Sequence, residues 1–303
     1  MRLLALIACG LLTSGLMAGS ASAAGADDDA QTRYAQVEEF RIAYRTLGSG
    51  PPIVLLTRFR GTLDTWDPLF LGQLARTHRV ITLDFPGVGY SSGTVPTDVG
   101  RVATLVHAFA ATLGVTRYAV LGWSWGGIVA QTLLLQHPEA VSHAVLVGTA
   151  PPGPGQAAIQ PLWLERALKP VNDLADEEIL FFEPASDASR RAAKGSHDRI
   201  YARPDVARRI PSREAELQPF FAMADAFKKD AVGRRDLLTK SPVPMLILCG
   251  DNDPSVPATN WYPLIGRIPK GQLVVLPQSG HGPQHQYPHL SAQYIAAFMR
   301  DGS

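Results

Sequence analysis

Residues 122–127 read Gly-Trp-Ser-Trp-Gly-Gly, with a serine between two tryptophans and glycines on both sides. A short apolar run at 118–121 precedes this stretch, and a helix-like segment at 128–137 follows it. A strand, a sharp turn and a helix are therefore expected to meet at Ser124. The glycines two residues before and two residues after Ser124 fit positions where neighbouring chain leaves no room for a Cβ atom. The start of the helix also stabilises negative charge beside the serine.

Apolar runs of the kind that is buried on both faces of a sheet recur along the chain, at 53–56, 80–83, 118–121, 144–147, 245–249 and 273–276. Helix-like segments alternate with them, at 66–76, 99–113, 128–137 and 290–299. This alternation predicts an α/β fold with a mostly parallel, doubly wound sheet. The alternating pattern within 37–47 predicts one further, half-exposed strand. Ligands of such sheets bind beyond the carboxyl ends of the strands, so the residues that follow each strand matter most.

The segment 151–240 breaks this rhythm. It opens with Pro-Pro-Gly-Pro-Gly and continues with charged, helix-like pieces that contain no strand-like run, which predicts a helical cap inserted into a core formed by 36–150 and 241–303. Residues 24–35 are polar, and we expect them to be flexible. Residues 1–23 have a basic start, an apolar centre and small residues before Ala23, which is typical of a cleaved bacterial signal peptide. We therefore expect export to the periplasm or beyond.

The composition excludes several classes of partner. The 28 Lys and Arg residues are matched by 27 Asp and Glu residues, and no basic run is present. We expect neither nucleic acid nor, after removal of the signal peptide, a membrane as a partner. Cys249 is the one cysteine beyond the expected signal peptide, so no intramolecular disulfide can form, and we expect an inert buried thiol. The composition leaves the oligomeric state open.

A serine hydroxyl becomes a useful nucleophile when a base takes its proton. His281 lies in Gln-Ser-Gly-His-Gly-Pro, directly after the run at 273–276, and is the predicted base. His285 and His289 lie beyond that turn, and we expect both at the surface. The histidine in turn needs a carboxylate that fixes its tautomer. Two candidates, Asp251 and Asp253, follow the run at 245–249.

The motifs around these residues resemble those of the α/β hydrolases, over about residues 37–300. Gly-Trp-Ser-Trp-Gly matches the Gly-x-Ser-x-Gly nucleophile turn of that family. Gly250, Asp253 and Pro257 match its Gly-x-x-Asp-x-x-x-Pro stretch. The resemblance implies that Asp253 is the acid and that Asp251 caps the turn. The chain order Ser124, Asp253, His281 is the order expected of this fold.

The resemblance also implies that the backbone N–H groups of Trp125 and Phe59 stabilise an oxyanion. Family members often have His-Gly-Phe where this chain has Thr57-Arg58-Phe59. Arg58 and Arg60 are candidates for binding a substrate carboxylate, and Arg58 is a candidate for the substrate pocket. The alternative is an ion pair from one of the two loop arginines, Arg58 or Arg60, to Asp64, Asp67 or Asp84.

Aromatic side chains leave further alternatives open. Trp123 and Trp125 either pack in the core or line the substrate pocket. The cap phenylalanines at 181–182 and 220–221 are expected to hold the cap to the sheet rather than to touch substrate.

These residues predict a serine hydrolase that cleaves a small carboxylic ester or lactone through an acyl-enzyme. We expect no metal and no cofactor. The resemblance extends to cofactor-free haloperoxidases and perhydrolases, carbon–carbon bond hydrolases and proline iminopeptidases. A non-catalytic binding module is the alternative outside the enzymes, and the altered loop at 57–61 is the feature that favours it.

Overall fold

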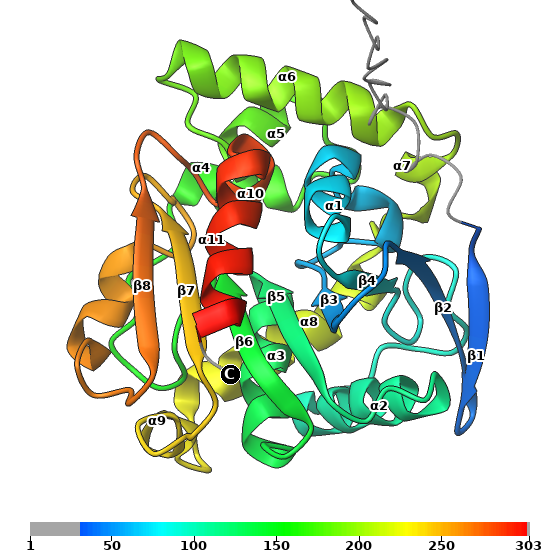
Figure 1. The fold of residues 1–303 in the computed structure, drawn as a ribbon. Coiled ribbons are helices and arrows are strands. Elements are labelled where there is room, and N and C mark those ends of the chain that lie inside the picture. Colours follow the sequence, from blue (N-terminus) through cyan, green and yellow to red (C-terminus); the bar gives the residue numbers. More distant parts are fainter. Residues whose placement is uncertain (1–30, 302–303) are drawn as a thin grey trace, which may run out of the picture.

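The computed structural model describes residues 31–301, and their centre is an eight-stranded sheet (Figure 1). The expected signal peptide lies outside the described residues. The strands are β1 (Arg33–Val37), β2 (Phe40–Leu47), β3 (Pro52–Leu56), β4 (Arg79–Leu83), β5 (Tyr118–Trp123), β6 (Val141–Val147), β7 (Met245–Gly250) and β8 (Gly271–Leu276). Each of the six apolar runs predicted from the sequence lies within one of these strands. The burial expected for the run at 273–276 is wrong, because β8 is an edge strand in which only Leu276 is buried.

The strand order is β1-β2-β4-β3-β5-β6-β7-β8. Strands β3 to β8 are parallel to one another, while β2 runs antiparallel to both β1 and β4. Strand β5 lies between β3 and β6, and Leu56 at the end of β3 pairs with Gly122 near the end of β5. The loops after β3 and β5 therefore begin side by side. The predicted α/β fold with a mostly parallel sheet is confirmed.

The amino-terminal end of the sheet differs from the prediction. The strand expected within 37–47 is β2, and it forms a hairpin with the unexpected strand β1, because Glu38 adopts a φ of 51° and the chain reverses between the two strands. Strand β1 begins at Arg33, so the expected flexible segment 24–35 is wrong for residues 33–35. Polar residues occur in β1 because this edge strand buries only alternate side chains, those of Ala35 and Val37.

Helices cover both faces of the sheet and bury separate apolar clusters. On one face α2 (Val99–Thr112) packs beside α3 (Trp125–Gln136), and on the other α1 (Pro68–Ala75) packs beside α11 (Pro288–Asp301). Neighbouring residues of β5 belong to different clusters: Val120 packs in the cluster on the α2 and α3 face, and Leu121 packs in the cluster on the α1 and α11 face. Short helices η1 (Leu63–Thr65), η2 (Ala258–Leu264) and α10 (Pro283–Gln286) lie in the loops.

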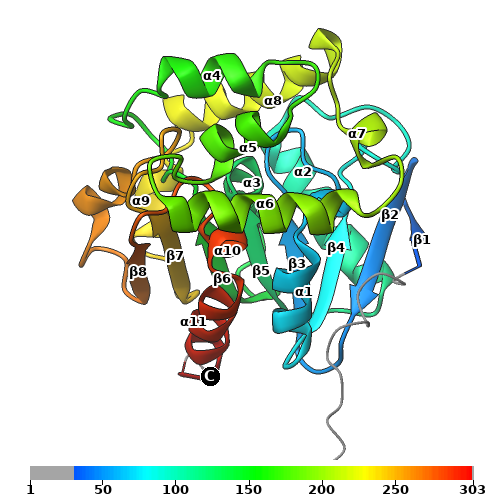
Figure 2. The ribbon, with the colours of Figure 1, turned by 90° about the horizontal axis from the view of Figure 1, so that it is seen from above.

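The segment between β6 and β7 contains helices and, among its described residues, no strand. The helices are α4 (Pro161–Ala167), α5 (Leu174–Phe181), α6 (Asp187–Tyr201), α7 (Val206–Arg209), α8 (Glu214–Lys229) and α9 (Arg234–Leu238). Helices α4, α5 and α6 lie above the carboxyl ends of the strands, and α6 contacts α1 and α10 (Figures 1 and 2). We call the segment 151–240 the cap. Among residues 31–301, none of the helices is long and apolar enough to cross a bilayer.

Candidate active site

Ser124 occupies the turn between β5 and α3. Its backbone has φ 55° and ψ −117°, a strained conformation for a residue with a side chain, and its N–H donates to the carbonyl of Val147 at 2.8 Å. A Cβ atom at Gly122 would lie 2.4 Å from the carbonyl oxygen of Gly126, and one at Gly126 would lie 2.1 Å from that of Leu56. Close approach of backbone therefore requires both glycines, and the turn presents the serine at the carboxyl edge of the sheet.

His281 and Asp253 reach Ser124 from the loops after β8 and β7. Nε2 of His281 lies 2.8 Å from Oγ of Ser124, and Nδ1 lies 2.8 Å from Oδ2 of Asp253. The carboxylate can only accept, so Nδ1 carries the proton and Nε2 is free to accept from the serine. The backbone N–H groups of Ser255 and Val256 both donate to Oδ1 of Asp253 at 2.8 Å, which fixes the carboxylate. The structure thus joins the three predicted residues in one chain of hydrogen bonds.

The second candidate acid, Asp251, lies elsewhere. It is exposed, and its Oδ1 accepts from the backbone N–H of Ser279 at 2.9 Å. Asp251 therefore ties the loop after β7 to the loop after β8. That contact holds the loop that carries His281, in agreement with the expected capping role.

Trp123 is not part of the substrate pocket, and this candidate is wrong. Its side chain is 1% exposed, and its Nε1 donates to the carbonyl of His281 at 2.8 Å. The indole fills the core beneath the histidine because β5 directs this side chain to the face that is covered by α1 and α11. Trp125, in contrast, lines the cavity described below.

The loop at 57–61 lies opposite the serine. Phe59 and Trp125 line the same cavity as Ser124, so the two predicted oxyanion donors belong to one compartment. The Phe59 ring packs on the cap rings of Phe220 and Phe221, with centroids 5.5 Å and 5.1 Å apart. The cap therefore contacts this loop directly.

The expected ion pairs of the loop arginines are absent from the described residues. Asp64 pairs with Arg45 at 2.6 Å, Asp67 pairs with Arg199 at 2.6 Å, and Asp84 accepts from the backbone N–H groups of Leu63 and Tyr90. With these carboxylates occupied by other groups, the ion-pair alternative is wrong.

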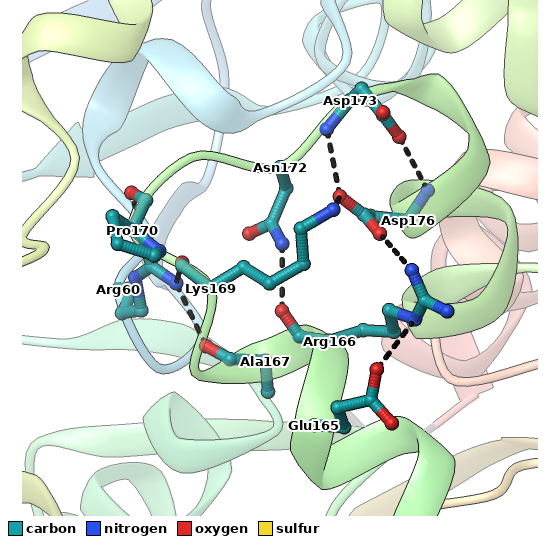
Figure 3. A network of polar contacts seen from close by, with 9 residues as sticks. All are labelled: Arg60, Glu165, Arg166, Ala167, Lys169, Pro170, Asn172, Asp173 and Asp176. Atoms are coloured by element: carbon teal, nitrogen blue, oxygen red, sulfur yellow. Dashed lines mark hydrogen bonds and ion pairs between the residues drawn. The ribbon is translucent and has the colours of Figure 1, made fainter.

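Arg60 instead binds backbone of the cap. It donates to the carbonyls of Ala167, Lys169, Pro170 and Pro211 at 2.7–2.8 Å. Figure 3 shows the guanidinium of Arg60 beside the first three of these residues. In the same figure Arg166 and Lys169 reach the buried carboxylate of Asp176, which holds the turn between α4 and α5.

A cavity of about 260 Å³ opens at Ser124 between the cap and the core. Most of its lining is apolar, and it includes Trp125, Ile128, Trp163, Ala224, Val256 and the cap residues Phe220 and Phe221. The phenylalanines at 220–221 thus line the cavity as well as holding the cap, which the sequence did not reveal. No sequence pattern pointed to Trp163 either, because nothing local places a cap side chain above a particular strand.

His285 is buried rather than exposed, so its expected surface position is wrong. Its side chain lies among Trp66, Phe70 and Trp123, and its Nε2 accepts from the backbone N–H of Asp67 at 3.2 Å. Burial lowers the pKa of His285 to about 4. The imidazole is therefore a neutral part of the core. His289, three residues beyond α10, is exposed as expected.

The remaining groups carry no sign of a metal. Among residues 31–301, no cluster of His, Cys, Asp and Glu side chains is arranged to hold an ion. Cys249 is buried at the end of β7, and burial raises the pKa of its thiol.

Comparison with known proteins identifies the family. A family model described as alpha/beta hydrolase fold matches residues 51–288, and the chain belongs to that family. The resemblance stated from the sequence, and with it the class of enzyme, a hydrolase, are confirmed.

Similar proteins include esterases. Pimeloyl-(acyl-carrier protein) methyl ester esterase from Vibrio campbellii is 28% identical over 264 residues, which cover 84% of this chain and 98% of the relative. An alpha/beta hydrolase fold protein from Chitinophaga pinensis superposes with a TM-score of 0.79 at 28% identity, covering 91% of this chain and 99% of that one. An esterase from a Rhodococcus species superposes with a TM-score of 0.67 at 26% identity, covering 90% of this chain and 99% of that one.

Proposed function

We propose that this protein hydrolyses a carboxylic ester or lactone through an acyl-enzyme on Ser124. The observation that carries the proposal is the hydrogen-bonded chain Asp253–His281–Ser124, which ends at a serine that lines the apolar cavity. Two relatives whose sequences align with this chain over 98% of their own length are named as methyl ester esterases, and these names support the same chemistry.

In this mechanism Oγ of Ser124 attacks the ester carbonyl while Nε2 of His281 takes the serine proton. Asp253 keeps the imidazole in the productive tautomer and stabilises its protonated form. The amides of Trp125 and Phe59 stabilise the negative oxygen of the tetrahedral intermediate. His281 then protonates the departing alcohol, and a water molecule activated by the same histidine releases the acid.

The cavity defines the general shape of the substrate. Its aromatic and aliphatic lining suits an apolar portion of the ester, because burial of apolar surface favours binding by roughly 25 cal/mol per Å². Specificity would then arise from cap residues of α4 and α8, since Trp163, Phe220 and Phe221 contribute much of the lining.

A fluorophosphonate probe tests the proposal directly. The wild-type protein should gain the mass of one phosphonyl group, and Ser124→Ala should gain none. Ser255→Ala is the matched control, because Ser255 lines the same cavity and its backbone N–H to Asp253 survives the change. An unlabelled, folded wild-type protein would instead favour a non-catalytic binding module.

A panel of methyl and ethyl esters and of lactones then identifies the reaction. Hydrolysis of any of them that is lost in Ser124→Ala supports the mechanism. A labelled protein that turns over no ester and no lactone would contradict the proposed reaction while leaving the activated serine in place.

A further inference from the structure

Arg58 presents hydrogen-bond donors that the protein does not use. A guanidinium carries five N–H donors. The one hydrogen bond that Arg58 donates among the described residues runs from Nη1 to the carbonyl of its neighbour Phe59, at 2.9 Å. Its Nε is buried and has no partner there. Buried donors are nearly always satisfied in folded proteins, so Arg58 keeps hydrogen-bonding capacity that the described residues do not use.

Aromatic rings hold the guanidinium in place. Its central carbon lies 4.3 Å from the ring centroid of Phe181 and 5.4 Å from that of Trp123. Such contacts are favourable for a cation but accept none of its hydrogen bonds. Burial lowers the pKa of Arg58 to about 10, so the group is still a cation at neutral pH. The side chain is therefore oriented and charged, with Nε and Nη2 free of protein acceptors.

The local charges are unbalanced. The charged groups that face Arg58 are Arg60 and Glu177, and the phenol of Tyr201 also lies near. The Glu177 carboxylate accepts from the Tyr201 hydroxyl and from Nδ1 of His197, both at 2.8 Å. The partners of Arg60 are neutral carbonyls. Two cations thus share one carboxylate, which leaves one positive charge without a counter-charge.

Arg58 lies where a substrate would be. Together with Asn172, Ser124 and His281 it lines a compartment of about 20 Å³. That space exceeds the roughly 10–15 Å³ that one water molecule requires, so it has room for an oxygen atom that approaches Arg58. The compartment meets the large apolar cavity at Ser124, because Phe59, Trp163 and Ala167 line both. A group bound to Arg58 would therefore lie only a few bonds from the reacting carbonyl.

We propose that Arg58 binds a carboxylate of the substrate, so that the natural ester carries a free carboxylate close to its reacting carbonyl and an apolar group on the other side. A half ester of a short dicarboxylic acid has this form. A guanidinium can donate two parallel N–H bonds to the two oxygens of a carboxylate, which favours this anion over a single-atom one. The inference rests on the proposed ester hydrolysis at Ser124 and names its class of substrate.

Two esters that differ in one charge test the subsite. Monohexyl succinate carries the carboxylate, and hexyl succinamate replaces it with a neutral amide of the same shape. Release of hexanol gives kcat/KM for each, and the ratio of the two values isolates the charge. The wild-type protein should favour the half ester, and Arg58→Gln should lower the ratio roughly 10- to 100-fold, as expected for lost charge-assisted hydrogen bonds.

Two further variants complete the test. Arg58→Lys keeps the charge but loses the planar pair of donors, so its ratio should lie between those of wild type and Arg58→Gln. Arg208→Gln removes an exposed cap charge that pairs with Asp205, and its ratio should equal that of wild type. An unchanged ratio in Arg58→Gln would overturn the carboxylate subsite, while phosphonyl labelling of the same variant shows that it is folded.

A binding measurement separates this inference from the proposed function. Calorimetry of succinate with Ser124→Ala and with Ser124→Ala/Arg58→Gln reports the subsite without catalysis. Succinate binding that requires Arg58, in a protein that hydrolyses no ester, would support the subsite and contradict the esterase. Ester hydrolysis with no dependence on Arg58 in either measurement would support the esterase and overturn the subsite. Failure of both measurements would overturn both.

Discussion

The two aspartates after β7 differ in what their carboxylates contact. Asp253 holds Nδ1 of His281, and Asp251 holds the backbone of Ser279. Asp253→Asn should place an amide N–H against Nδ1 and force the proton onto Nε2, which then cannot accept from Ser124. We expect kcat for ester hydrolysis to fall roughly 10³- to 10⁴-fold. Asp251→Asn is the control and should retain most of the activity; an equal loss in both variants would contradict the assignment.

His285 couples the stability of the fold to pH. Its folded-state pKa is about 4 because the neutral ring is buried, and Arg58 and Arg199 lower the pKa further against the opposing charge of Asp67. The unfolded chain binds a proton near pH 6.5, so it takes up more protons than the native state between pH 6.5 and 4. Stability should therefore fall as the pH falls through this window, by up to about 3 kcal/mol.

Urea unfolding at pH 7, 5.5 and 4 measures that effect. His285→Gln removes the titrating ring, so its free energy of unfolding should fall less steeply with decreasing pH than that of wild type. His289→Gln removes an exposed histidine three residues beyond α10 and should follow the wild-type curve. If His285→Gln and wild type showed the same slope, another group would account for the acid sensitivity.

The sequence predicts the location of some side chains in the fold but not of others. Ser124, Asp253 and His281 each follow a parallel strand, and parallel strands bring such positions to one edge of the sheet. Trp123 and His285 could not be placed in this way. The side of the sheet that receives Trp123 depends on the pleat of β5. The burial of His285 depends on α6 and α11, which pack against the short helix α10, and on Phe70 of α1, which lies beside the imidazole ring.

At the scale of elements, Arg60 joins the loop at 57–61 to the cap. Its four acceptors come from segments more than 100 residues away in the chain, and its own φ is 60°. Arg60→Met leaves buried carbonyls of the cap without donors, so the free energy of unfolding should fall by roughly 2–4 kcal/mol. The rate of phosphonylation should fall too, because the same loop carries the amide of Phe59. Thermal unfolding and the labelling rate measure the two effects.

Two other arginines serve as controls for this prediction. Arg213→Met removes an exposed cap side chain and should change neither quantity. Arg199→Met breaks the pair between α6 and Asp67, a tie between cap and core away from the loop. It should lower stability and leave the labelling rate near the wild-type value. If Arg199→Met slowed labelling as much as Arg60→Met, loosening of the whole cap would explain both.

Elements with a strong apolar pattern were predictable, and those set by distant contacts were not. The six parallel strands β3 to β8 could be recognised because their runs are short, apolar and separated by helical segments. Strand β1 escaped prediction because it is an edge strand with exposed polar side chains, stabilised by pairing with β2. The cap helices were expected as a group, but their positions depend on contacts such as those of Arg60 that leave no local pattern.

At the scale of the whole molecule, the site exists only where cap and core meet. The core supplies Ser124, His281 and Asp253 together with part of the cavity wall, and the cap supplies the facing wall, which includes Trp163 and Phe220. Chemistry and selectivity are therefore separable: changes in the cap should alter which esters are hydrolysed, while the arrangement around the serine stays the same.

Ala224 offers a test of this division, because its small side chain lines the cavity from α8. In the wild-type protein the apolar cavity should make kcat/KM rise with chain length, both across methyl esters from acetate to octanoate and across acetate esters from methanol to octanol. Ala224→Trp should fill part of the cavity and abolish this rise. For the longest esters we expect a loss of roughly 10- to 100-fold, and for methyl acetate little change. Ala226→Trp places the same side chain on the exposed face of α8 and should keep the wild-type profile. A uniform loss across all chain lengths in Ala224→Trp would instead mean that the cap governs the reacting groups themselves.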